Sequence, residues 1–173
     1  MRPQPLAPLL VLFLIPVVSG FQIGVKFLGS GDTVVSGVCG SRWAHIVVVS
    51  PGEVPWNDAE RARMQALNER DVSIDYAFMV TVEKFMRHGC ENVPDYMISG
   101  SRGNFTGVDD IHFFYSADEV LYGALPDFEE ACKRANVPYT VSARPKMVHC
   151  YCMLPIFKEA KEDFAKIVDI LKK

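Results

Sequence analysis

Two ionisable residues near the C-terminus, Asp118 and His149, have the types and spacing of an acid–base pair. They lie 31 residues apart, with one predicted helix and one predicted strand between them. Each therefore follows a strand, and the carboxyl ends of neighbouring parallel strands meet at one edge of a sheet. A carboxylate beside an imidazole holds one tautomer and stabilises the cation, so that the imidazole can take a proton from a hydroxyl nucleophile.

The elements that would position this pair follow from the apolar pattern. Short β-branched or aromatic runs predict strands at 45–50, 111–115 and, more weakly, 139–143. Helical spacing of apolar residues predicts helices at 57–70, 76–88, 126–135 and 155–173, with a loop at 90–109. This order of strands and helices indicates an α/β fold with a parallel sheet.

Two segments around the pair resemble a known family. The runs 111–121 (IHFFYSADEVL) and 147–151 (MVHCY) are similar to the C-terminal portion of hormone-sensitive-lipase-like esterases, the α/β-hydrolase fold-3 proteins. The run from 45 to 100 resembles the preceding strand of the same family and the long connection that follows that strand, so the resemblance covers 45–173. It implies a partial α/β-hydrolase fold, with C-terminal parallel strands, flanking helices and the N-terminal half of the core missing.

The resemblance also implies a chemistry. Asp118 would be the acid of a catalytic triad and His149 the general base, in hydrolysis of a small carboxylic ester through a serine acyl-enzyme, with no cofactor and no metal. The remains of an acyl pocket would bind the ester.

The chain departs from this family at the nucleophile. The sequence contains no Gly-x-Ser-x-Gly turn and no His-Gly-Gly stretch for an oxyanion hole. We therefore expect a weak or inactive esterase, arising from a truncated gene product or a mispredicted gene start. The alternative is a secreted, non-catalytic binding protein, a pseudoenzyme. Loss of the upstream strands would leave strand 45–50 with a bare edge, which predicts self-association.

The first twenty residues predict a signal peptide. One Arg is followed by an uncharged apolar run and by small residues at 18–20. A membrane-anchor helix is the alternative, and residues 21–44 form an unassigned leader. The signal predicts secretion, and without it the protein would be cytoplasmic. Asn104 begins an Asn-Phe-Thr triplet that fits a glycosylation acceptor.

Composition and charge exclude some functions. The net charge is −3 and the sequence pI is about 5.8, whereas a nucleic-acid binder needs a basic surface. No uncharged apolar run of 18 residues follows residue 20, so no later membrane span is expected.

The cysteines and the remaining histidines suggest weaker candidates. Five cysteines are an odd number and are expected as free thiols (Cys39, Cys90, Cys132, Cys150 and Cys152). A zinc site at His149, Cys150 and Cys152 and a nucleophilic Cys39 are alternatives, but Cys150 and Cys152 fit core thiols better. Glu119 is expected to be a supporting or surface acid. His45 and His112 are expected to be structural, and His88 to cap a helix.

Overall fold

The computed structural model describes residues 10–13, 43–88 and 95–172. Its strands form a single sheet, and most of its helices connect them. The strands are β1 (Leu10–Phe13), β2 (Trp43–Val49), β3 (Val108–Ser116) and β4 (Tyr139–Arg144). The helices are α1 (Asp58–Leu67), α2 (Tyr76–Arg87), α3 (Asp95–Ile98), α4 (Leu125–Ala135) and α5 (Lys158–Leu171).

The sheet is parallel throughout and has the order β1-β2-β3-β4. Within the register, His45 of β2 faces Asp110 of β3, and Phe114 of β3 faces Ser142 of β4. Because every strand runs in the same direction, the loops that follow β2, β3 and β4 leave from one edge. That edge is where the predicted pair should meet.

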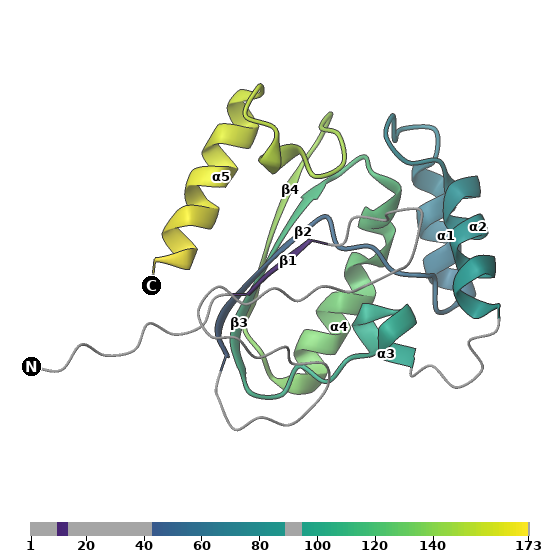
Figure 1. Cartoon of the computed structure of the whole chain (residues 1–173), viewed down its shortest axis with the longest axis horizontal. Coiled ribbons are helices and arrows are strands. Elements are labelled where there is room, and N and C mark those ends of the chain that lie inside the picture. The colour runs from purple at the N-terminus through teal and green to yellow at the C-terminus, as the bar shows by residue number, and fades with distance from the viewer. Residues whose placement is uncertain (1–9, 14–42, 89–94, 173) are drawn as a thin grey trace, which may run out of the picture.

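Helices cover both faces of the sheet (Figure 1). On one face α1, α2 and α4 pack over a core built on Phe113, Tyr115 and Met64. On the other face α5 and the 3₁₀ turn at Tyr151–Met153 pack over Val47, Val49 and Phe114. Alternate residues of β2 and β3 thus enter opposite cores, as expected for strands buried on both sides.

Helix α5 is held to the sheet by a buried ionic cluster as well as by apolar contacts. The Asp163 carboxylate is fully buried and binds the Arg144 guanidinium at 2.7 Å, the Lys166 ammonium at 2.7 Å and the Tyr151 hydroxyl at 2.6 Å. These partners outweigh burial and hold the pKa of Asp163 well below its ordinary value.

The predicted α/β class with a parallel sheet is confirmed, and all three predicted strands are present. The predicted helices also form, with ends that shift by up to three residues. Two details differ: the described part of the predicted loop at 90–109 contains α3, and Phe85 and Phe164 of the expected apolar stripes are 68% and 45% exposed.

Strand β1 falls inside the predicted signal peptide and pairs with β2. The edge of the described sheet is therefore β1, and β2 does not have the bare edge that the sequence predicts. The last two residues of the unassigned leader at 21–44 begin β2, and the rest of residues 1–42 lies outside the described residues. Of the helices described, none has the length and apolar character needed to span a membrane.

Candidate active site

His149 lies at the predicted edge, in the loop between β4 and α5, but its acid partner is Glu119. The ring Nδ1 is 2.8 Å from the Glu119 carboxylate, which is fully buried. Glu119 follows β3 directly, just before a 3₁₀ turn over Val120–Ala124. Glu119 was expected to be a supporting or a surface acid, and its burial beside His149 contradicts the surface alternative only.

Asp118 does not pair with His149. Its carboxylate forms an ion pair with Arg70, and its second oxygen accepts a 2.6 Å hydrogen bond from the backbone N–H of Lys146. The prediction that Asp118 holds the imidazole is thus corrected, because adjacent side chains leave the turn after β3 in different directions. Asp118 instead ties the loop that carries His149 to the end of β3 and to Arg70.

The Glu119 carboxylate is held by three donors. Besides His149, it accepts hydrogen bonds from the Ser50 hydroxyl at 2.9 Å and from the Ser116 backbone N–H at 3.0 Å. Ser50 ends β2 with φ 44°, in the left-handed region that a non-glycine residue adopts at some cost. This conformation places its hydroxyl between two loops, where it also accepts from the Cys150 N–H at 3.0 Å.

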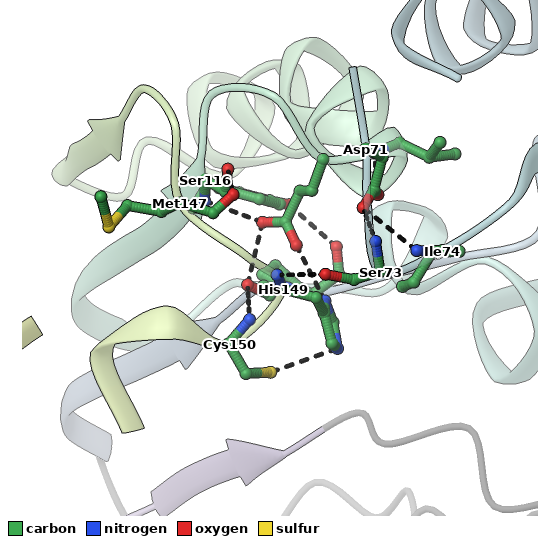
Figure 2. A network of polar contacts seen from close by, with 12 residues as sticks. Asp71, Ser73, Ile74, Ser116, Met147, His149 and Cys150 are labelled. Carbon is green, nitrogen blue, oxygen red and sulfur yellow. Dashed lines mark hydrogen bonds and ion pairs between the residues drawn. The ribbon is translucent and has the colours of Figure 1, made fainter. Parts of the chain in front are cut away.

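The surrounding loops fix the histidine from its backbone side (Figure 2). The His149 N–H donates to the Ser73 hydroxyl at 3.2 Å, and the Asp71 carboxylate accepts from the Ser73 and Ile74 N–H groups. Ser116 donates its hydroxyl to the Met147 carbonyl at 2.6 Å. Four loops, which follow α1, β2, β3 and β4, therefore meet around His149.

The second ring nitrogen of His149 faces a thiol. Figure 2 shows the Cys150 sulfur beside the ring, and its distance to Nε2 is 3.2 Å. Cys150 adopts φ 54°, and this left-handed backbone turns its half-buried side chain back toward the ring. In an acyl-transfer triad, Nε2 is the atom that faces the nucleophile. The thiol therefore lies where a nucleophile would lie.

The charges of this cluster are shifted strongly. Burial lowers the pKa of His149, but the hydrogen bonds and charges of Cys150 and Glu119 outweigh it and raise the pKa to about 10. Burial raises the pKa of Glu119, against hydrogen bonds from His149, Ser50 and Ser116 that lower it. These contacts favour the cationic form of His149, in which both ring nitrogens donate to their partners.

The other predicted site residues are placed as follows. Cys132, Cys150 and Cys152 are free thiols, as predicted, and Cys132 and Cys152 are buried. Cys39 and Cys90 lie outside the described residues. His88 caps the C-terminal end of α2. Asn104 is exposed on a loop, where its glycosylation stays a prediction.

Sequence reasoning missed Ser50, and it missed the contacts that Glu119 and Cys150 make with His149. Asp118 and Glu119 are adjacent acids, and nothing in the residue types indicates which of their side chains points toward His149. A serine between a buried strand and Pro51 is a signal only for a turn. Cys150 was expected in the core because its backbone conformation is not visible in the sequence.

Comparisons with known proteins support the fold. No protein-family model matches the sequence, and no curated protein matches it. Solved structures do: an esterase of the bacterial hormone-sensitive lipase family is 20% identical with a TM-score of 0.60, over 73% of this chain and 42% of that one. The hormone-sensitive-lipase homologue EstE7 from a metagenome library is 18% identical with a TM-score of 0.62, over 74% and 43%.

A hormone-sensitive lipase from a metagenome library is similar to the same degree, at 17% identity and a TM-score of 0.61. This chain spans about two fifths of the length of these esterases. Identity at this level shows the fold alone. The predicted resemblance is therefore confirmed at the level of the fold: the chain has a partial α/β-hydrolase fold, similar to the C-terminal part of hormone-sensitive lipase family esterases.

Proposed function

We propose that this chain carries the acid–base half of a carboxylic-ester hydrolase site, with His149 as the general base and Glu119 as the acid that orients it. The observation that supports the proposal is the 2.8 Å contact between His149 Nδ1 and the buried Glu119 carboxylate, at the C-terminal edge of a parallel sheet. A carboxylate at Nδ1 fixes the tautomer in which Nε2 accepts the proton of a nucleophile.

The chain alone is proposed to be a weak esterase or an inactive one. The sequence has no Gly-x-Ser-x-Gly turn to present a serine and no His-Gly-Gly stretch to supply oxyanion donors. Loss of an activated nucleophile costs a factor on the order of a million in rate, and loss of one oxyanion donor costs about 3 kcal/mol. The raised pKa of His149 adds to the deficit, because a smaller share of the imidazole is neutral at neutral pH and only the neutral form acts as a general base.

The inactivity is tested by assaying the full chain with p-nitrophenyl acetate beside the His149→Ala variant. We expect the same background rate in both. Turnover that disappears in His149→Ala would overturn the proposed inactivity while supporting ester hydrolysis.

The acid–base role is tested in a chimera. Its N-terminal part comes from EstE7 and ends just before the strand that matches β2, and residues 43–173 of this chain follow. We expect esterase activity that falls by about 10⁴-fold in Glu119→Gln and further in His149→Ala. Asp118→Asn is the matched control, because it changes the adjacent acid and should retain most of the activity. A folded chimera that depends on Asp118 and not on Glu119 would contradict the assignment.

Secretion belongs to the same proposal. An apolar leader at 1–20 and an Asn-Phe-Thr triplet whose asparagine is exposed both fit an exported glycoprotein. Expression in a eukaryotic secretory host, followed by N-terminal sequencing and glycosidase treatment of the medium, tests both features.

A further inference from the structure

Three metal-binding side chains meet near the other ends of β2 and β3, away from His149. They are His45 of β2 and Asp110 and His112 of β3, and their donor atoms lie within 4.8 Å of one another. His45 and Asp110 are register partners in neighbouring strands, and His112 follows Asp110 by two residues. Since side chains alternate along a strand, all three project from the face that α5 covers.

The distances suit ligands of one ion. Oδ1 of Asp110 is 2.8 Å from Nδ1 of His45 and 3.0 Å from Nε2 of His112. Two ligand atoms of a tetrahedral ion, each about 2.05 Å from the metal, are separated by roughly 3.3 Å, so both contacts need to lengthen by only about 0.3 to 0.5 Å when an ion enters. The carboxylate oxygen is therefore already placed as the ligand adjacent to both imidazole nitrogens.

A neighbouring hydroxyl orients one of the rings. Nδ1 of His112 is 2.7 Å from the Thr140 hydroxyl of β4. Metal-bound histidines characteristically bind a polar group through their other ring nitrogen, which fixes the tautomer and the ring direction. When Nδ1 carries the proton and donates it to Thr140, Nε2 keeps the lone pair that a metal needs.

Position and exposure allow an ion to enter. The side chains of His45 and Asp110 are each 26% exposed and that of His112 is 11% exposed. The ligands are fixed on a parallel ladder rather than on a loop, so little conformational entropy is lost on binding. Three protein ligands also leave at least one coordination position for water or a small anion.

We propose that His45, Asp110 and His112 bind one divalent first-row transition metal ion, with Zn²⁺ as its representative. Two imidazole nitrogens and one carboxylate oxygen favour Zn²⁺, Co²⁺, Ni²⁺ or Cu²⁺ over Mg²⁺ and Ca²⁺, which prefer oxygen ligands. The site is independent of the proposed hydrolase chemistry, because it uses neither Glu119 nor His149. A bound ion would join β2 to β3 and stabilise the sheet at this end.

The test measures binding of Zn²⁺ alone to the full chain by isothermal titration calorimetry, and of Co²⁺ by absorption spectroscopy. We expect one ion per chain and a raised melting temperature. Replacing His45 by Gln or Asp110 by Asn changes a direct ligand, so binding should weaken by at least the roughly 10- to 100-fold that loss of an outer-shell partner costs. Both positions are partly exposed, so these variants should fold, and circular dichroism of each checks that they do.

Two control variants distinguish this site from other side chains that could bind the metal. His88→Gln removes an exposed histidine, and Cys150→Ser removes the thiol beside His149; both should bind as the unchanged chain does. Bound Co²⁺ should show no thiolate-to-metal charge-transfer band. If the chain does not bind Zn²⁺, His45, Asp110 and His112 form a hydrogen-bonded cluster only. If binding is lost in Cys150→Ser but kept in His45→Gln, the ion binds at another site. Either result overturns the proposal.

Discussion

The imidazole of His149 has two partners that both favour its cationic form. Glu119 accepts at Nδ1 and Cys150 lies at Nε2, and together they outweigh the cost of burying the charge. A histidine whose pKa is raised in the folded state stabilises the fold fully below its unfolded value near 6.5. That contribution is lost as the pH rises through about 10. The cluster of Glu119, His149 and Cys150 thus stabilises the fold at neutral pH, and it is also the proposed acid–base half of a hydrolase site.

Replacing Cys150 by Ser tests the share of the thiol in this shift. Serine keeps a hydroxyl that can contact Nε2 but removes the sulfur and its electrostatic contribution, so the pKa of His149 should fall from about 10, while Glu119 keeps it above the ordinary value. An NMR titration of the ring protons measures it, with the exposed His88 as internal reference. An unchanged pKa of His149 would show that Glu119 alone sets it.

At the scale of elements, residue types predicted the strands and most of the helices but not the loop geometry. The β-branched run at 45–50 and the aromatic run at 111–115 could be buried only as strands of a covered sheet. The partner of His149 could not be predicted. The choice between Asp118 and Glu119 depends on the turn after β3 and on Arg70, which lies 48 residues away in the sequence. Long-range pairing of this kind leaves no local pattern.

Helix α1 carries a second buried acid whose environment is unlike that of Glu119. Glu60 is fully buried, and its carboxylate accepts from the Trp56 N–H at 2.6 Å. Burial, followed by the charge of Glu53, raises the pKa of Glu60 to about 8. Glu53 in turn binds the hydroxyl and N–H of Ser101. The start of α1 therefore holds two neighbouring carboxyl groups, Glu53 and Glu60, and burial raises the pKa of both.

We expect the stability of the fold to fall as the pH rises from about 4.5 to 8, because the folded state binds one more proton than the unfolded state over this window. The contribution of Glu60 is a decrease of roughly 1.4 kcal/mol in the free energy of unfolding per pH unit. In Glu60→Gln the slope should become shallower by that amount, since glutamine does not titrate, while the other groups with raised pKa values, such as His149, still contribute. Urea unfolding at several pH values measures it. The exposed Glu130→Gln is the control, and an identical slope in Glu60→Gln would refute the assignment.

At the scale of the whole molecule, the described sheet ends in a strand that belongs to the apolar leader. Residues Leu10–Phe13 pair in register with Ile46–Val49, so β1 covers the edge of β2. An uncovered strand with this composition presents a row of unpaired backbone groups and favours pairing with another chain. The leader and the oligomeric state are therefore linked: removal of the predicted signal peptide at residue 20 would expose the edge that β1 covers.

A chain that begins at residue 21 should therefore self-associate more strongly than the full chain, with an apparent mass that rises with concentration. Size-exclusion chromatography with light scattering measures this. Replacing Leu10–Phe13 by Gly-Ser-Gly-Ser in the full chain keeps the length and removes the strand, so it should reproduce the association if β1 pairing is the cause. If the shortened chain stays monomeric at every concentration while the full chain associates, the apolar leader itself is the adhesive surface, and β1 has no protective role.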